Sequence, residues 1–327
     1  MIPMDNKERI ELLKGTSGIQ AGTSAPGGLA NYVVKRAPSG NDETIRAVTA
    51  SFGNGKSSSI ALDIGSRFGE TKDFGYRFNA AYEDLNPYIQ NTQGHRKLMA
   101  QAMDWRITPD SKLEWEFETS ERQQIDVNGY SLLGNNLPPV VNGTRNLTWQ
   151  SWAVPGVFNA NTGSVRFKQN LGEGWLWTTS YGAQRLRTDD RLTFAYGCSA
   201  ESRWDRYCSN GSFDLYDYRS DNERRINDAF KTEVSGQLKW GGLRHDVGMS
   251  LLRQRQLDRM STMQAYNWAG TGSISGAADS AAAPAPGDLN TNRTEYSTEI
   301  AVHDRVRLNP LTALWIGVRH TMLDRQS

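Results

Sequence analysis

The chain has 327 residues, with 37 basic and 36 acidic side chains and a formal net charge of +1. Such balanced charge argues against a nucleic-acid partner. No stretch approaches the roughly 18 to 20 consecutive apolar residues of a membrane helix, so a helical membrane protein is excluded. The mean hydropathy of −0.63 remains compatible with a membrane β-barrel, whose strands need apolar side chains only at alternate positions.

The chain opens with an amphipathic run and a glycine-rich stretch. Ile10, Leu12 and Leu13 are expected to be buried while the charged residues between and around them stay in water. The glycines between positions 15 and 28, together with Pro26, favour turns and positive φ angles. The sequence Tyr-Val-Val at 32–34 then predicts a short strand that stops before Pro38.

Segments of alternating polarity separated by turns predict a long series of antiparallel strands. At 112–122, for example, Leu113, Trp115 and Phe117 share one face and charged residues fill the other, which suits a water-filled lumen. We expect about eleven such strands. They lie at 44–52, 57–68, 74–83, 97–107, 112–122, 164–170, 175–188, 223–240, 243–259, 294–308 and 311–323.

The turns fall into two classes. Short turns near 70, 109, 173, 241 and 310 alternate with mostly longer connections near 54, 88, 140, 205 and 275. Short periplasmic turns and long extracellular loops are typical of outer-membrane barrels. Aromatic residues gather beside the short turns, as a girdle at one membrane surface would, and are Phe68, Phe74, Trp105, Trp115, Trp175, Trp177, Trp240 and Trp315.

Three long polar stretches, 123–161, 189–221 and 260–292, are predicted to be functional loops. The second contains Cys198 and Cys208, which are the only cysteines of the chain. Their spacing on a loop fits a local disulfide formed in an oxidising compartment, with two free thiols as the alternative.

Residues 7–36 resemble the closing segment of the plug domain of TonB-dependent siderophore receptors, which lie in bacterial outer membranes. Ala21 stands where the family usually has Tyr, and Thr16 stands where Pro is common. The family pattern is matched by the run from Arg9 to Gly15, by Gly22, by Pro26, Gly27, Gly28, Leu29 and Asn31, and by Val33, Lys35, Arg36 and Pro38.

The resemblance implies an all-β fold, in which a 22-stranded antiparallel transmembrane β-barrel encloses a plug. This chain would then supply the end of the plug (1–40) and the first half of the barrel (44–327). We expect a fragment, because Met1 is not followed by a signal peptide and the C-terminal residues lack the aromatic end of a last barrel strand. The implied partners are a ferric siderophore, outer-membrane lipid, and the TonB complex acting through an N-terminal segment absent here.

The sequence contains no recognisable catalytic or metal-binding constellation. The four histidines lie on different predicted strands without metal-ligand spacing. The segment Gly15-Thr16-Ser17-Gly18 does not form a nucleophile elbow. We therefore expect no enzymatic activity, no metal site, and no cofactor other than the ferric siderophore as transported ligand.

A binding site is expected instead, because aromatic faces, arginines, amides and hydroxyls suit bulky polar ferric chelates. The candidate ligand-binding residues are Gln20, Ala21, Thr23 and Ser24 in the plug loop, and Trp149, Trp152, Tyr196, Trp204, Arg206, Tyr207 and Tyr266 in the long loops. The candidate plug-to-wall contacts are Arg9, Glu11 and Lys14 on the plug, and Glu114, Glu116, Arg166 and Lys231 on the wall.

The sequence thus predicts an outer-membrane receptor for TonB-dependent uptake of a ferric siderophore. Import of haem, cobalamin or an oligosaccharide through the same fold is the first alternative. A passive porin is a second, although residues 7–36 argue against it. A soluble β-rich adhesin is a third, although it would have no reason to gather Trp at one class of turn.

Overall fold

The computed structural model describes residues 2–14, 28–53, 56–127, 129–139, 142–276 and 279–327. They form a two-stranded hairpin, β1 (Lys7–Lys14) and β2 (Gly28–Val34), and a 13-stranded antiparallel sheet. Among the described residues, no helix is long and apolar enough to cross a membrane. The amphipathic run near Ile10 forms strand β1. Ile10 and Leu12 are exposed, contrary to the expectation that they are buried.

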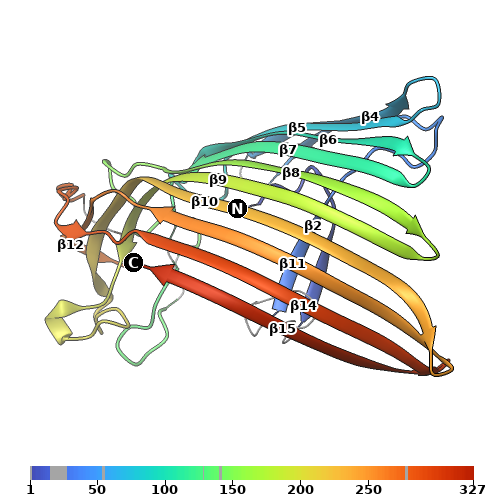
Figure 1. Ribbon diagram of the computed structural model, residues 1–327. Helices are drawn as coiled ribbons and strands as arrows, with labels where there is room; N and C mark the ends of the chain where they lie inside the picture. Colours follow the sequence, from blue (N-terminus) through green and yellow to red (C-terminus); the bar gives the residue numbers. More distant parts are fainter. Residues whose placement is uncertain (1, 15–27, 54–55, 128, 140–141, 277–278) are drawn as a thin grey trace.

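The large sheet is a curved wall of tilted strands (Figure 1). Neighbours along it follow the order β15-β14-β11-β10-β9-β8-β7-β6-β5-β4-β3. The predicted antiparallel strands are all present, because strict alternation of polarity specifies which side of a strand faces water. They are β3 (Ile45–Phe52), β4 (Ser58–Phe68), β5 (Phe74–Leu85), β6 (Gly94–Thr108), β7 (Ser111–Gln124), β8 (Gly156–Gly172), β9 (Trp175–Ala195), β10 (Ser212–Trp240), β11 (Leu243–Arg259), β14 (Arg293–Asn309) and β15 (Thr312–Gln326).

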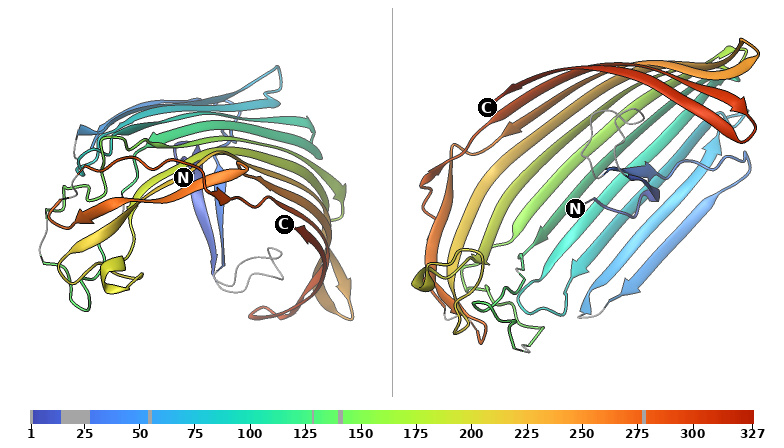
Figure 2. Two further views of the ribbon diagram at one scale, coloured as in Figure 1. Left: turned by 90° about the vertical axis from the view of Figure 1, so that its left-hand side faces the viewer. Right: turned by 90° about the horizontal axis from the view of Figure 1, so that it is seen from below.

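The hairpin of β1 and β2, which we call the plug hairpin after the resemblance of residues 7–36, lies on the concave side of the wall (Figure 2). Lys7 at the start of β1 pairs with Glu118 of β7, and Arg36 just after β2 pairs with Glu116, so these two carboxylates face the lumen. Side chains alternate along a strand, so Trp115 and Phe117 face outward. The outer face near the short turns carries stacked rings, with 5.3 Å between the centroids of Phe68 and Phe74 and of Phe74 and Trp105.

Trp315 does not belong to the outer girdle, contrary to the prediction. Its ring stacks on His303 with 5.7 Å between centroids, and His303 lies over the backbone at Gly248, where a Cβ would collide with the imidazole. The strand register places Trp315 and His303 on the same side as Glu299, which pairs with Arg319 in the lumen. Proximity to a short turn does not determine which face of the strand a residue occupies.

The long loops are shorter than predicted, because several strands extend well past the membrane. A tilted strand needs only about 9 to 11 residues to cross. β8 begins at Gly156, β9 continues to Ala195, and β10 already begins at Ser212. The predicted loop 260–292 contains β12 (Met263–Ser273), which pairs with the upper part of β10, and the short β13 (Asp288–Leu289). Above the membrane the alternating side chains are polar or aromatic rather than apolar, so the sequence predicts loops where the strands continue.

Near the short turn between β4 and β5, a buried ion pair joins β4 to β6. The arginine of this pair also holds the linker that precedes β3. The Nη2 atom of Arg67 lies 2.6 Å from an oxygen of Asp104, and both side chains are at most 3% exposed. Arg67 also donates to the carbonyls of Pro38, Lys72 and Asp73. Burying a charge pair is tolerated only when such additional hydrogen bonds are made.

Substitution of Gly75 tests this arrangement. A Cβ at position 75 would lie 2.6 Å from the Arg67 guanidinium and from Ala37, so Gly75→Ala is expected to separate the pair and destabilise the barrel by about 2 to 4 kcal/mol. Urea unfolding of the intact receptor in lipid measures this loss. Gly182→Ala is the matched control, because its nearest neighbours are 3.9 Å away. Equal stability of the two variants would contradict the assignment.

Candidate ligand-binding site and plug contacts

Five aromatic rings gather on the strands that rise above the membrane. The rings of Phe194 and Tyr216 are 5.8 Å apart, and those of Tyr216 and Tyr266 are 5.4 Å apart. Tyr196 contacts Phe194 and Tyr216, and Tyr218 contacts Tyr266. β9, β10 and β12 thus build one aromatic face from residues far apart in sequence.

This aromatic face belongs to the inner side of the wall. Glu118 faces the lumen, and the register aligns it with Thr162 and then with Gln184 of β9. β9 is continuous from there to Ala195, so alternation brings Phe194 to the same side as Gln184. Tyr216 lies directly opposite Phe194. The aromatic face therefore overlooks the mouth of the lumen, above the plug.

The tyrosines of the aromatic face remain hydroxyl donors at neutral pH. Burial raises the pKa of Tyr216, and the nearby Asp214 carboxylate raises it further. Burial likewise raises the pKa of Tyr218, with Asp190 and Glu223 acting in the same direction. The face therefore combines apolar rings with neutral O–H groups, a combination suited to a bulky ligand with polar edges.

Two loops brace the back of the hairpin that carries the aromatic face. The Ser151 hydroxyl donates to Asp279 at 2.7 Å, and the Trp152 indole donates to the Ser280 carbonyl at 2.8 Å. The Arg219 guanidinium lies 5.7 Å from the centre of the Trp152 ring. These contacts join the connection between β7 and β8 to the one between β11 and β14. The braced loops hold β10 in place from the side opposite the aromatic face.

The predicted ligand-binding residues have different surroundings. Tyr196 and Tyr266 lie together on the aromatic face, whereas Trp152 braces its back. Trp149 and Trp204 are exposed and lie outside the five-ring cluster. Arg206 pairs with Asp205 and also donates to the Gly134 carbonyl. The plug-loop candidates Gln20, Ala21, Thr23 and Ser24 lie outside the described residues.

Sequence reasoning missed Phe194, Tyr216 and Tyr218, which complete the aromatic face. They were assigned to the loop 189–221. The alternation of Phe194 with Tyr196, and of Tyr216 with Tyr218, was the available signal that both strands continue there.

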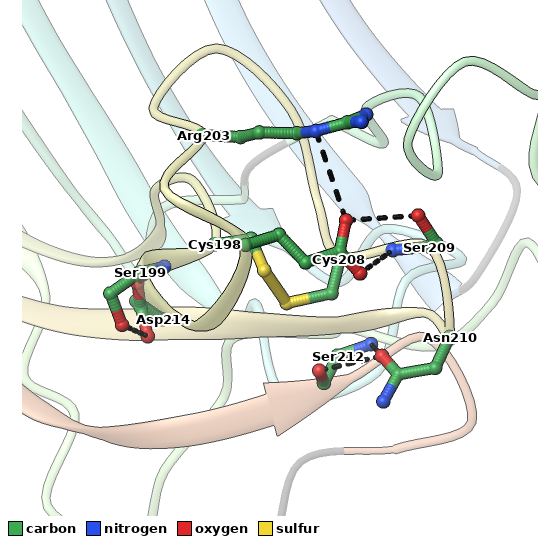
Figure 3. Close-up of a disulfide and its surroundings, with 9 residues drawn as sticks. Cys198, Ser199, Arg203, Cys208, Ser209, Asn210, Ser212 and Asp214 are labelled. Atoms are coloured by element: carbon green, nitrogen blue, oxygen red, sulfur yellow. Dashed lines mark hydrogen bonds and ion pairs between the residues drawn. A yellow bond between two sulfur atoms is a disulfide. The ribbon is translucent and has the colours of Figure 1, made fainter.

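A disulfide closes the tip of the hairpin between β9 and β10, as predicted. Cys198 and Cys208 are joined with their Cα atoms 5.0 Å apart (Figure 3). Asp214 accepts hydrogen bonds from the backbone N–H and the hydroxyl of Ser199 beside the bridge. Ser209 donates its backbone N–H and hydroxyl to Glu201, which lowers the pKa of that carboxyl. The tip is thus fixed by covalent and polar contacts together.

Tyr207 is a structural residue of the loop core. Its ring packs on Phe213 with 4.8 Å between centroids, and its hydroxyl donates to the Gly129 carbonyl at 3.1 Å. Leu133, Leu147 and Leu215 complete this core. Only 3% of Tyr207 is exposed, so its ring is not accessible to a ligand in this conformation.

The burial of Tyr207 predicts an alkaline transition. Burial, with a smaller effect of Tyr130, raises its pKa to about 12, against about 10 for an unfolded chain. The folded loop therefore retains the phenol proton to a higher pH than the unfolded chain does. The resulting contribution to the free energy of unfolding is complete below pH ~10 and is lost as the pH rises towards ~12. Absorbance titration of phenolate should show several late-ionising tyrosines, and Tyr207→Phe should remove one late step from that titration. An unchanged late step in that variant would contradict the assignment.

Ion pairs at the open end of the plug hairpin, where β1 begins and β2 ends, attach it to the wall. Lys7 pairs with Glu118, and the Asn6 amide donates to the same carboxylate at 2.7 Å. Arg36 pairs with Glu116. Lys7 is aligned with Val34 in the hairpin and Arg36 follows two residues later, so both contacts lie at the open end of the hairpin and hold that end against β7.

Two more plug contacts flank them. Lys35 reaches Asp63 of β4 at 2.9 Å, and Arg96 of β6 reaches Asp5 at 2.6 Å. Burial raises the pKa of Asp5, but the hydrogen bond and charge of Arg96 outweigh it and hold the pKa below its usual value. The plug is therefore seated by charge-assisted hydrogen bonds rather than by apolar packing.

Only part of the predicted plug-to-wall set is correct. Glu116 does contact the plug. Arg9 and Glu11 instead pair with each other on the hairpin. Three of the predicted wall charges pair within the wall: Glu114 and Arg166 with each other, and Lys231 with Glu233. The plug residues that do contact the wall include Lys7, Lys35 and Arg36, which lie outside the predicted stretch from Arg9 to Lys14. Lys35 and Arg36 belong to the family pattern.

Removing two of these contacts should loosen the plug. In the intact receptor, Lys7→Ala together with Arg36→Ala removes the charged plug partners of Glu118 and Glu116, and we expect about tenfold faster hydrogen exchange in β1 and β2. Lys97→Ala is the control, because Lys97 is exposed and pairs with Glu121 on the wall alone. Unchanged exchange in the double variant would show that these pairs do not seat the plug.

Comparison with known proteins places these features in context. No protein-family model matches the chain. It is 32% identical over 118 residues to the metal-pseudopaline receptor CntO of Pseudomonas aeruginosa, covering 36% of this chain and 16% of that protein. It is 21% identical over 263 residues to the ferrichrome outer membrane transporter/phage receptor of Escherichia coli, covering 76% of this chain and 34% of that protein.

A solved structure agrees in fold over nearly the whole chain. The ferric preacinetobactin receptor BauA of Acinetobacter baumannii matches 99% of this chain and 48% of its own length, with a TM-score of 0.81 and 16% identity. The likeness confirms the predicted all-β, antiparallel barrel fold. The chain spans about half or less of the length of these relatives.

Proposed function

We propose that this chain is part of a TonB-dependent receptor that captures a ferric siderophore at the bacterial outer membrane and admits it past a plug. The resemblance predicted from residues 7–36 is confirmed by relatives that are siderophore or metal-chelate receptors. The observation that carries the proposal is the aromatic face of β9, β10 and β12, which overlooks a lumen that holds a plug hairpin.

The aromatic face performs the first step, capture. A ferric chelate is bulky, so it loses much hydration when its flat ligand arms lie against Tyr216 and Tyr266. The tyrosine hydroxyls supply hydrogen bonds to oxygens on the chelate. The loops bracing β10 from behind keep these rings in place before the ligand arrives, which lowers the entropy lost on binding.

Passage is the second step, and it requires the plug contacts to break. The ion pairs of Lys7, Lys35 and Arg36 are partly buried and polar, so water entering beside them can replace them. An apolar plug interface would resist such hydration. The proposed role of the TonB complex is to pull the plug, acting through a segment N-terminal to these residues. The chain itself contributes ion pairs between plug and wall that can break while the wall stays folded.

The aromatic face can be tested directly. In the intact receptor, Tyr216→Ala and Tyr266→Ala should each weaken binding of the cognate ferric siderophore about tenfold, because each removes one ring and one hydroxyl from the face. Binding is measured by quenching of intrinsic fluorescence across a panel of hydroxamate, catecholate and carboxylate chelates, with haem and cobalamin included.

The control for this test is Tyr82→Ala, which removes an exposed tyrosine from the outer face of β5. Wild-type affinity is expected for that variant. If both aromatic-face variants bind every chelate as the wild type does, the aromatic face is not the capture site. Binding of haem or cobalamin in place of all siderophores would replace the proposed ligand class.

A further inference from the structure

Carboxylates lie at the foot of the aromatic face, on the inner side of the wall. Alternation along β9 brings Asp190 to the same inward side as Phe194. Glu223 of β10 is aligned with Thr188, which is also an inward position of β9. Asp190 and Glu223 therefore face the lumen just below the aromatic rings.

The carboxylates are close enough to the rings to act on them. Burial raises the pKa of Tyr218, and the charges of Asp190 and Glu223 raise it further. Burial and then the charge of Asp214 have the same effect on Tyr216. Rings and carboxylates therefore form one continuous site, with negative charge at its edges.

Asp190 is the least compensated of these carboxylates. Among the residues that the structure describes, its carboxylate has no hydrogen-bond or ion-pair partner. Burial raises the pKa of Asp190, Glu223 and Asp126 raise it further, and Arg225 opposes them. Arg225 is itself paired with Glu223 at 2.9 Å. The negative charge at Asp190 is therefore left for a ligand to neutralise.

A cavity of about 160 Å³ lies beside Asp190, and its lining includes Asp126, the apolar side chains of Phe158 and Leu192, and Arg122. Pockets that enclose a whole small-molecule ligand start at roughly 300 Å³, so this one holds an arm of a ligand rather than all of it. Two carboxylates beside apolar walls suit a short alkyl arm that ends in a cation.

Other basic residues near the aromatic face are directed away from it. Arg191 and Arg219 alternate with the inward positions, and they pair with Asp221 at 2.7 Å and with Asp217 at 2.9 Å. The third strand of the face, β12, contains no charged residue. Carboxylates therefore outnumber basic side chains around the site, with Asp126, Asp190, Asp214 and Glu223 set against Arg122 and Arg225.

We propose that the receptor selects ferric chelates that carry a cationic arm, such as a protonated primary amine, and that this arm enters the cavity beside Asp190. The inference rests on the proposed capture function and names the ligand class of the same site. Aromatic faces attract cations, and an ammonium group donates charge-assisted hydrogen bonds to carboxylates. An anionic chelate, such as a ferric tris-catecholate, is repelled by the same carboxylates.

Three forms of one linear ferric trihydroxamate test the proposal, because they differ only in the charge of the arm. The terminal amine is left free and protonated, acetylated and neutral, or succinylated and anionic. At neutral pH the intact receptor should bind the ammonium form about tenfold more tightly than the acetylated form, and the succinylated form most weakly. Quenching of intrinsic fluorescence measures the three affinities.

The variant Asp126→Asn/Asp190→Asn removes both charges from the cavity with little change in side-chain size. The preference for the ammonium form over the acetylated form should then fall to about twofold or less. Asp189→Asn is the matched control, because Asp189 points to the other face of β9, where it accepts the backbone N–H of Asn222 at 2.8 Å. It should keep the wild-type preference.

Urea unfolding in lipid verifies that each variant is folded. The inference is overturned if the wild type does not bind the ammonium form more tightly than the succinylated form, or if the double variant keeps the full preference. Capture of a ferric siderophore still stands in either case, provided that some ferric chelate binds. Binding of no ferric chelate at all would instead contradict the proposed function itself.

Discussion

The backbone hydrogen-bond ladder that runs without a break from β3 to β15 constrains everything else in this structure. A strand in lipid must satisfy its N–H and C=O groups with its neighbours, so the register between strands is fixed. Once the register is fixed, each side chain has an assigned face. Glu116 and Glu118 then meet the plug, and Trp115 and Phe117 are directed outward. One geometric rule thus separates the inner face of the wall from its outer face.

The same ladder continues above the membrane, where water replaces lipid on the outside. There the strands no longer need apolar outward residues, and β9, β10 and β12 instead present aromatic rings inward and a braced loop core on their other side. Rigid strands position Tyr216 and Tyr266 more accurately than a flexible loop would. The disulfide at Cys198 and the contact between Ser151 and Asp279 extend this rigidity to the tips.

The plug and the aromatic face differ in the forces that hold them. Rings and loop core pack by apolar burial, which water does not easily reverse. The plug is attached by ion pairs such as that of Arg36 with Glu116, which exchange readily for hydrogen bonds to water. In the proposed receptor, different side chains on the inner face of the same wall would therefore provide a permanent mouth and a removable plug.

The sequence by itself predicted the eleven wall strands, their alternating faces and the resemblance of residues 7–36, and it favoured the disulfide over two free thiols, because each depends on local spacing or on a motif of fixed length. Tertiary structure decided what depends on pairing between distant strands. Only the register shows that Trp315 points inward and that Phe194 meets Tyr216, and only the docking of the hairpin on β7 shows that Lys7 rather than Arg9 reaches the wall. Local sequence sets which residues alternate, whereas the partner strand sets which of the two alternating sets faces the lumen.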